Sequence, residues 1–476
     1  MGKFAINHCI LLLLLVFSPI MVFAKVATMP PVEQMIQQLE GNPSIGIKVV
    51  DLTTGKTLYS RNADRVFVPA SNQKILTALG ALSFLGPNFT FKTQFLTNDA
   101  QVDNGILKGD LYLKFSGAPD FTASDLENMI EQLEKRGVNG IAGRVYIDDS
   151  DFDGIQMGPG WMWDDAKHCF SAPISASIIN DNCIVLRIDP GAKPGVPAEI
   201  KPFKRNQGVK FENHTMTRGA NQQGCYVRLR PKQQNTYSLS GCIASTSKGQ
   251  SLSVSLQNPH LYAQALLTAM LNNFNVQYPQ GIEFKRAPQG ATVLVEENSR
   301  TVSELVTTQL KESDNIISEV LFKKIGQQYF SSAGTWKNGS DALRKLLSSK
   351  AKIDLSAAVI ADGSGLSRYN LITPEQIVGL LTLAHNDYTI ANEFKAALPI
   401  SGVDGTLETR MINSEAKHRV RAKTGTMANV SSLSGYIQTK HNHVLAFSIL
   451  INGISGSQGK YLGFEDWLCN YFVTHH

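Results

Sequence analysis

The chain contains three short polar motifs in a fixed order: Ser71-Asn72-Gln73-Lys74, then Ser313-Asp314-Asn315, then Lys423-Thr424-Gly425. Each motif alone is common, because Ser-x-x-Lys arises by chance and Ser-Asp-Asn is an ordinary helix start. Together they supply a hydroxyl nucleophile, two lysines, and hydroxyl and amide groups that can hold a substrate. The ordered set therefore predicts a serine enzyme whose site is assembled from three separate stretches of the chain.

Ser71 lies where a buried helix is expected to begin. Pro69 precedes it, and apolar residues recur at helical spacing between residues 75 and 82. Because positions i and i+3 share a helix face, Lys74 is expected one turn above the Ser71 hydroxyl. A partly desolvated lysine has a lowered pKa, so its neutral amine can take the serine proton. We interpret Ser71 as the nucleophile and Lys74 as its base; for this motif alone, a helix cap beside a solvated lysine is the alternative.

The second motif marks a break between two helices. Ser313-Asp314-Asn315 follows a helical stretch at residues 302–311 and precedes an apolar helical pattern at residues 316–321. A loop of this kind can present a hydroxyl and an amide into a cleft. Ser313 is a candidate for relaying a proton to a leaving amine, and Asn315 for orienting Lys74 and a substrate carbonyl. Taken alone, the motif is equally typical of an ordinary helix cap.

The third motif opens a stretch of strand composition that turns at residues 440–443 and continues as a second strand at 444–451. Gly425 lets a bound peptide approach the backbone closely. Lys423 and Thr424 offer a cation and a donor to a substrate carboxylate, and Thr426 completes the candidate substrate-binding strand. A plain hairpin without a ligand is the alternative for this motif alone.

With these three motifs, the chain resembles the class C low-molecular-mass penicillin-binding proteins, which are D-alanyl-D-alanine carboxypeptidase/endopeptidases. Longer matching segments extend the resemblance over nearly the whole mature chain: Gly160-Trp161-Met162-Trp163-Asp164-Asp165 with Cys169-Phe170-Ser171-Ala172-Pro173, Asp362-Gly363-Ser364-Gly365-Leu366-Ser367-Arg368, and Ile400-Ser401-Gly402-Val403-Asp404-Gly405-Thr406-Leu407. The resemblance implies that the protein trims peptidoglycan stem peptides and cross-links through an acyl-enzyme on Ser71, and that β-lactam antibiotics bind there.

Two other classes of protein share parts of this pattern. A serine β-lactamase is disfavoured because 242 positions separate Ser71 from Ser313 and because the sequence has no Glu-x-x-Leu-Asn deacylation segment. A catalytically idle peptidoglycan-binding or sensor module is disfavoured because all three motifs keep their reactive side chains. Steady-state hydrolysis of penicillin would identify the first class, and a failure to release D-alanine would identify the second.

The resemblance implies an α/β (α+β) fold with a serine β-lactamase/transpeptidase-like core. A large nested α/β plus β insert is expected between the Ser-x-x-Lys helix and the Ser-Asp-Asn loop. Periodicity supports this order, with a hairpin pattern at 45–59 and helical patterns at 123–136 and 259–271. The expected divisions are a signal peptide (1–24), the first part of the core (25–95), the inserted domains (96–290, with a nested β subdomain at about 189–250) and the second part of the core (291–476).

The resemblance also implies which residues recognise the substrate. In related proteins the insert contributes an aspartate and a phenylalanine, which match Asp165 and Phe170, and the core contributes an arginine, which matches Arg368. A carboxylate pairs with an ammonium and a guanidinium pairs with a carboxylate, so together they suit the free end of a diaminopimelate side chain. The chain departs from the family at Ala428, where related enzymes often have a glutamine.

The N-terminus has the features of a secretory signal peptide. Lys3 is followed by an apolar run at residues 9–17 and a small-residue cleavage site at 22–24, which predicts a periplasmic protein. Losing this segment reduces the formal net charge from +5 to +4, too small to favour a nucleic-acid partner. We expect at most peripheral contact with the membrane, and the oligomeric state is not readable from the sequence.

Five cysteines follow the signal peptide, an odd number for an exported chain. Cys169 and Cys183, and likewise Cys225 and Cys242, are close enough in sequence to close short loops, although the connectivity is not fixed by sequence. Cys469 is expected to be a buried thiol. His168-Cys169 and His441-Asn442-His443 each lack a second ligand pair at zinc spacing, so we expect no metal and no other cofactor.

Overall fold

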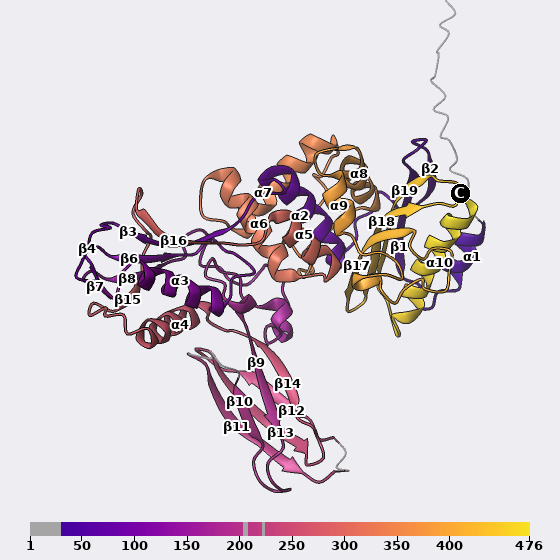
Figure 1. The fold of residues 1–476 in the computed structure, drawn as a ribbon. Helices are drawn as coiled ribbons and strands as arrows, with labels where there is room; N and C mark the ends of the chain where they lie inside the picture. The colour runs from indigo at the N-terminus through magenta and orange to yellow at the C-terminus, as the bar shows by residue number, and fades with distance from the viewer. Residues whose placement is uncertain (1–29, 203–207, 221–223) are drawn as a thin grey trace, which may run out of the picture.

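The core of the molecule is built on one antiparallel sheet with the strand order β17-β18-β19-β1-β2. In the computed structural model, which describes residues 30–202, 208–220 and 224–476, these strands come from both ends of the chain (Figure 1). The expected signal peptide at residues 1–24 lies outside the described residues. The strand bounds are β1 (Ser44–Asp51), β2 (Thr57–Arg61), β17 (Val420–Met427), β18 (Val430–Gln438) and β19 (Val444–Asn452).

Helices cover both faces of this sheet, which explains why its strands are apolar along most of their length. On one face, α1 (Pro30–Gln37) and α10 (Gly459–His475) pack against residues such as Ile47. On the other face, α8 (Pro374–Asn386) packs against residues such as Leu450. Removing both faces from water supplies the main driving force for this layered core.

A group of helices lies between the core sheet and the insert (Figure 1). Every residue of α2 is buried, and α2 continues directly from the 3₁₀ turn Ala70–Gln73 that carries the candidate nucleophile. The helices packed around it hold that turn against the edge strand β17. Their bounds are α2 (Lys74–Gly80), α5 (Val302–Lys311), α6 (Asn315–Phe330), α7 (Trp336–Ala351) and α9 (Ala391–Ala397).

The insert begins with a mixed sheet in the order β15-β8-β6-β3-β16, covered by α3 (Ala123–Lys135) and α4 (Pro259–Asn273). A capping box between Thr122 and Asp125 starts α3, and Asn258 caps α4. The strands are β3 (Lys92–Thr97), β6 (Leu111–Lys114), β8 (Val145–Asp148), β15 (Ile282–Phe284) and β16 (Thr292–Asn298), with a small second sheet of β4 (Val102–Asp103), β5 (Ile106–Leu107) and β7 (Gly140–Ile141).

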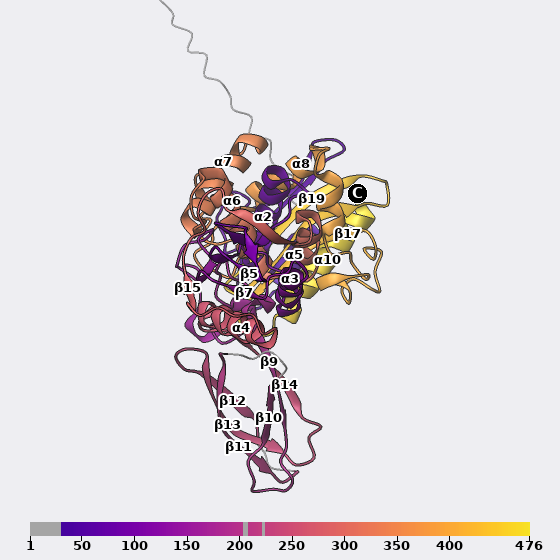
Figure 2. The same cartoon turned by 60° about the vertical axis from the view of Figure 1, so that its left-hand side comes forward.

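A β subdomain nested in the insert projects away from the rest of the molecule (Figures 1 and 2). It consists of two three-stranded sheets, β10-β9-β14 and β11-β13-β12. The strands are β9 (Cys183–Asp189), β10 (Glu199–Pro202), β11 (Lys210–Arg218), β12 (Val227–Pro231), β13 (Thr236–Ala244) and β14 (Gln250–Ser255). β12 and β14 are both edge strands, and backbone hydrogen bonds between residues 196–198 and 215–217 join the two sheets.

Strand pairing suggests domain boundaries slightly different from those expected. β3 begins at Lys92 and β16 ends at Asn298, and both strands belong to the insert sheet. We therefore propose that the insert runs from about residue 92 to 298 rather than from 96 to 290. The proposed boundaries differ from the expected ones because β3 and β16 pair with each other across nearly 200 residues of intervening chain, which local patterns do not reveal.

The cysteines form the two pairs that their sequence proximity allowed. Cys169 is bonded to Cys183, and Cys225 to Cys242, while Cys469 is a buried free thiol as predicted. The first disulfide joins the segment before β9 to β9 itself. Within the described ranges, no helix combines the length and the apolar character needed to cross a membrane.

Candidate active site

Ser71 occupies the 3₁₀ turn that precedes α2, and Lys74 is the first residue of α2. Lys74 is completely buried, and its Nζ donates to Ser71 Oγ (3.0 Å), Asn315 Oδ1 (2.7 Å) and the carbonyl of Ser364 (2.8 Å). Burial lowers the pKa of Lys74 to about 8, although nearby carboxylates act in the opposite direction. The lysine is therefore both oriented toward the serine and easier to deprotonate than an exposed lysine.

The hydrogen bonds of Lys74 also set the direction of its lone pair. When the ammonium loses one proton, Asn315 and Ser364 can retain the two remaining N–H groups. The lone pair then faces Ser71 Oγ, which lies 3.0 Å away, within the range for proton transfer.

The second motif is held where sequence analysis expected it, between α5 and α6. Asp314 caps α6 by accepting from the backbone N–H of Ile317 (2.7 Å), so the motif also performs the ordinary capping role. Ser313 has a positive φ of 61°. This left-handed backbone conformation lets the loop turn sharply into the helix.

Lys423 connects the third motif to the second. Its fully buried Nζ donates to Ser313 Oγ (2.9 Å) and to the carbonyl of Thr424 (2.9 Å). Burial, together with the positive charge of Lys74, holds the pKa of Lys423 well below its usual value. The two lysines thus lie close enough to influence each other, and the structure brings all three motifs into one site.

The serine turn and strand β17 are in direct contact. A side chain at Gly425 would collide with Ser432 and would lie 2.9 Å from both the Pro69 carbonyl and the Ser71 nitrogen. Asn72 strengthens this contact by donating to the Lys423 carbonyl of β17 (3.1 Å), and it also donates to Ser432 Oγ of β18 (2.9 Å). Sequence analysis assigned Gly425 to substrate approach, and the structure adds a second reason within the protein: only glycine fits where the strand passes the nucleophile.

The outer edge of β17 is open beside the nucleophile. β17 pairs with β18 on one side, and on its other side the described residues contribute only an isolated bridge between Ile400 and Arg421. Thr424 Oγ1 donates to Thr406 Oγ1 (2.8 Å), and the Thr426 side chain is exposed. Along residues 423–427 the outer edge of β17 has no strand partner among the described residues, although the Thr424 carbonyl accepts from Lys423 Nζ, so this edge can pair with an extended ligand.

A buried carboxylate fixes the loop that contacts Lys74. Glu319 is fully buried and accepts from the backbone N–H groups of Gly363 (3.0 Å) and Ser364 (2.9 Å) and from Trp336 Nε1 (2.9 Å). Burial raises the pKa of Glu319 to about 7. Because the carbonyl of Ser364 is an acceptor for Lys74, Glu319 is linked to Lys74 through the backbone of Ser364.

Asp362 organises the rest of the same loop and ties it to the insert. Its carboxylate accepts from the backbone N–H groups of Gly365 (2.8 Å) and Ser367 (2.6 Å), and from Asn370 Nδ2 (2.7 Å). Trp161 Nε1, which belongs to the insert, donates to the same carboxylate (3.0 Å). A single buried aspartate therefore fixes the conformation of the loop and anchors Trp161, at one end of the insert segment 160–173.

The other end of that insert segment contacts Asn315, the asparagine of the second motif. Asn315 Nδ2 donates to the carbonyl of Phe170 (2.8 Å), and the Phe170 ring stacks on His168. The adjacent disulfide between Cys169 and Cys183 restrains this part of the segment. Asn315 therefore bridges Lys74 on one side and the insert on the other.

Arg368 belongs to the core, and Asp165 belongs to the insert. Arg368 Nη1 donates to the carbonyl of Ala428 (3.2 Å), and its backbone N–H donates to the Gly160 carbonyl (3.5 Å). Asp165 lies midway between Gly160 and Phe170 in a short 3₁₀ turn, and its side chain is partly exposed. Among the described residues these two side chains form no ion pair with each other, and both residues are partly exposed.

Sequence reasoning missed two residues that support the catalytic groups. Glu319 was readable as a charge within the apolar pattern of α6, one turn after Asn315. Asn72 was read only as a spacer within its motif, although its amide links the nucleophile turn to β17. Both act through contacts between segments far apart in sequence. Within the described residues, no group of three or more His, Cys, Asp or Glu side chains is arranged to hold a metal ion.

Comparison with known proteins places this chain in a family. Residues 30–462 match the model of the D-Ala-D-Ala carboxypeptidase 3 (S13) family. The chain is 29% identical to D-alanyl-D-alanine carboxypeptidase DacB of Haemophilus influenzae, over 89% of this chain and 88% of that protein. It is 32% identical to the D-alanyl-D-alanine carboxypeptidase of Actinomadura sp. (strain R39), over 92% of this chain and 84% of that protein.

The fold agrees with the same family. The crystal structure of penicillin binding protein 4 (dacB) from Haemophilus influenzae superposes with a TM-score of 0.86 at 28% identity, covering 93% of this chain and 99% of that one. A second crystal structure of that protein, complexed with a β-lactam, gives a TM-score of 0.79 at 26% identity with the same coverage. The predicted α/β fold with a transpeptidase-like core is therefore confirmed, and the chain belongs to the D-Ala-D-Ala carboxypeptidase 3 (S13) family.

Proposed function

We propose that this protein is a serine D-alanyl-D-alanine carboxypeptidase and endopeptidase that acts on peptidoglycan stem peptides and cross-links through an acyl-enzyme on Ser71. Family membership supports the enzyme class. The observation that carries the mechanism is the contact between Ser71 Oγ and a fully buried Lys74 whose pKa is lowered to about 8. Near neutral pH such a lysine is neutral in a useful fraction of molecules.

In the acylation step, the neutral Lys74 amine takes the Ser71 proton as Oγ attacks the carbonyl of the penultimate D-alanine. Backbone N–H groups beside the nucleophile stabilise the negative charge that develops on the carbonyl oxygen. The amine of the departing residue then needs a proton. Ser313, whose hydroxyl is oriented by Lys423, can relay to it the proton that Lys74 took from Ser71, so that Lys74 is neutral again. Water subsequently attacks the ester, with Lys74 again as base, and releases Ser71.

The substrate peptide would lie along the open edge of β17 as an added strand. This placement gives main-chain hydrogen bonds without disturbing the core sheet, and it brings the scissile carbonyl beside Ser71. The Thr424 and Thr426 hydroxyls lie on the strand that would meet the substrate carboxylate. A bound carboxylate would also favour the charged form of Lys423, whose pKa burial otherwise lowers.

Asp165, Phe170 and Arg368 would recognise the diaminopimelate side chain. The aspartate suits its ammonium and the arginine suits its carboxylate. Phe170 offers an exposed ring on the same insert segment as Asp165. The absence of an ion pair between Asp165 and Arg368 within the described chain leaves both charges available to a zwitterion. Ala428 contributes only its carbonyl, which accepts from Arg368.

We further propose that the protein binds β-lactams at Ser71 and works in the periplasm after removal of residues 1–24. The signal-like N-terminal sequence and the two disulfides are both typical of an exported protein. The likeness to a β-lactam complex of a relative supports the antibiotic as a ligand.

Intact-mass analysis after incubation with penicillin tests the acyl-enzyme. We expect one added drug molecule, located in the peptide that contains Ser71, and no adduct in Ser71→Ala. Incubation with diaminopimelate-type peptidoglycan should release D-alanine and shorten cross-links, as measured by mass spectrometry of the muropeptides. Rapid steady-state turnover of penicillin without D-alanine release would instead identify a serine β-lactamase.

A further inference from the structure

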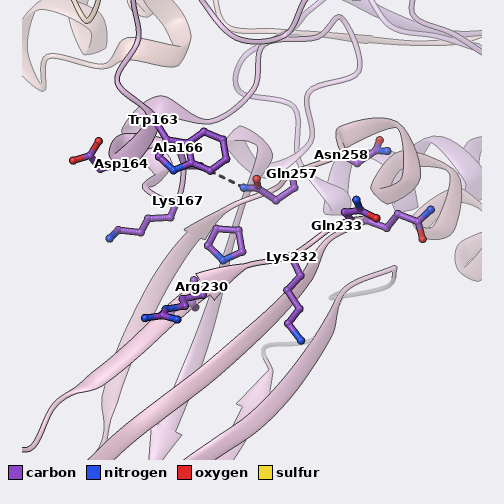
Figure 3. Close-up of a pocket in the computed structure, with 12 residues that line it drawn as sticks. Trp163, Asp164, Ala166, Lys167, Arg230, Lys232, Gln233, Gln257 and Asn258 are labelled. Carbon is purple, nitrogen blue, oxygen red and sulfur yellow. Dashed lines mark hydrogen bonds between the residues drawn. The ribbon is translucent and has the colours of Figure 1, made fainter.

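A cavity of about 670 Å³ lies outside the catalytic site, where the nested β subdomain meets the insert segment that carries Asp165 (Figure 3). Trp163 and Lys167 line it from the segment. Arg230 and Lys232 line it from the edge strand β12 and the residue that follows, and Gln257 and Asn258 from the turn after β14. None of the three catalytic motifs contributes to this cavity.

Trp163 is the unusual member of this lining. Its side chain is 91% exposed, although tryptophan is the largest apolar side chain and is usually well buried. Figure 3 shows the indole standing at the rim of the cavity. An exposed ring that borders a concave surface is typical of a binding platform, because an aromatic face can cover a flat apolar ligand face at little cost in conformational entropy.

The polar part of the lining suits a ligand rich in hydroxyl and amide groups. Gln257 is held in place by donating to the carbonyl of Ala166 (3.3 Å), and Asn258 is fixed as the cap of α4. Side-chain amides offer both donors and acceptors, which match hydroxyl and N-acetyl groups. Lys167 and Arg230 add exposed positive charge for carboxylates attached to the same ligand.

The segment that carries Trp163 also reaches the catalytic site. Phe170 lies seven positions after Trp163, and its carbonyl accepts from Asn315 Nδ2. A seven-residue chain spans at most about 25 Å, and the 3₁₀ turns within this one shorten it further. A stem peptide joins its sugar through its first residue, so about four residues, or roughly 14 Å when extended, separate the sugar from the scissile bond. One short insert segment thus connects the cavity with the candidate active site, where the peptide part of the substrate would lie.

We propose that this cavity binds the N-acetylated disaccharide to which the stem peptide is attached. The hydrophobic face of a sugar ring would stack on Trp163, and Gln257 and Asn258 would meet its hydroxyl and N-acetyl groups. The inference rests on the proposed function, because it assumes that a stem peptide occupies the catalytic site. It differs from the proposed recognition of diaminopimelate in using other residues and another part of the substrate.

Comparing two substrates in one variant tests the inference. The substrates are a diaminopimelate-containing pentapeptide and the same pentapeptide attached to its disaccharide, and D-alanine release gives kcat/KM for each. In the wild type we expect the disaccharide-linked peptide to be preferred. In Trp163→Ala the ratio of the two kcat/KM values should fall about five- to thirtyfold, as expected for losing one well-placed contact.

Tyr388 provides a matched control, because it is 90% exposed and belongs to the connection between α8 and α9 of the core, outside this cavity. Tyr388→Ala should leave the ratio at its wild-type value. A wild-type ratio near one, or an unchanged ratio in Trp163→Ala, would overturn the inference. Failure of every variant and the wild type to release D-alanine from either substrate would instead contradict the proposed function.

A binding experiment gives a readout that is independent of catalysis. Titrating the full-length mature protein with chitotriose, a neutral N-acetylated sugar, should change its tryptophan fluorescence, and the change should be absent in Trp163→Ala. Vesicles of anionic phospholipid serve as the contrasting probe, because the cations on β12 could also attract a membrane surface. A response to the vesicles without a response to chitotriose would refute sugar binding and assign the surface to lipid.

Discussion

The catalytic centre and the insert segment beside it are organised in opposite ways. In the candidate catalytic centre, Lys74, Lys423 and Glu319 are fully buried, and each has hydrogen-bond partners within the protein. In the insert segment, Asp165 is partly exposed without an ion pair among the described residues, and Trp163 is almost fully exposed. The proposed catalytic groups are therefore held in place by the protein alone, whereas the groups proposed to recognise the substrate are left available to a ligand.

This difference follows from what each region has to do. Proton transfer requires a base at a fixed distance with a lowered pKa, and burial within a packed core provides both. Recognition requires charges that have not already been neutralised by neighbours, because a ligand must compete with any internal partner. Substitutions in the two regions should consequently change different kinetic quantities.

The largest effect is expected for Lys74→Ala, because this change removes the proposed base from the buried centre. Acylation of Ser71 by penicillin should slow by about 10² to 10⁴-fold, the usual contribution of general base catalysis. The rate can be followed by intact mass, with circular dichroism to verify the fold. Acylation within about tenfold of the wild-type rate would exclude Lys74 as the base.

Lys74→Arg sharpens the same test because it separates charge from proton transfer. Arginine keeps the positive charge but stays protonated at all accessible pH values. The arginine variant should therefore acylate as slowly as the alanine variant. Recovery of the wild-type rate would mean that Lys74 acts through its positive charge. The buried centre would then differ from the insert segment in its electrostatics and not in providing a base.

A smaller and more selective effect is expected for Arg368→Ala. It should reduce kcat/KM on diaminopimelate peptides by more than about tenfold, because the side-chain carboxylate loses its partner. Lysine-type peptides lack that carboxylate, so kcat/KM on them should fall much less. D-alanine release from both substrates measures the two values. Arg136→Ala, an exposed arginine at the end of α3, provides the control. An equal loss on both peptides would show that Arg368 supports the catalytic scaffold instead.

The same contrast explains how much could be predicted from the sequence. Ser71, Lys74 and Lys423 were identified because their chemistry imposes short motifs, and the structure brings them together. The fold class followed from resemblance, while the limits of the insert sheet did not, since β3 and β16 pair across distant parts of the chain. Trp163 attracted no functional prediction, because its exposure depends on the placement of the β subdomain, which no local pattern encodes.

The smallest expected effect tests whether the buried network sets the pKa of the base. Because only neutral Lys74 accepts the serine proton, acylation of the wild type should accelerate as pH rises through about 8 and then level off. The negative charge of Glu319 favours the ammonium form of Lys74 and so raises this midpoint. Glu319→Gln removes that charge at nearly constant volume, so the midpoint should move to lower pH.

A variant that merely loosens the loop around Ser364 would lower the plateau of the pH profile and leave its midpoint in place. Glu312→Gln changes an exposed carboxylate next to Ser313 and should leave the midpoint unchanged, because solvent and salt screen its charge. A midpoint in Glu319→Gln equal to that of the wild type would show that burial alone tunes the base and that the buried carboxylate only shapes the loop.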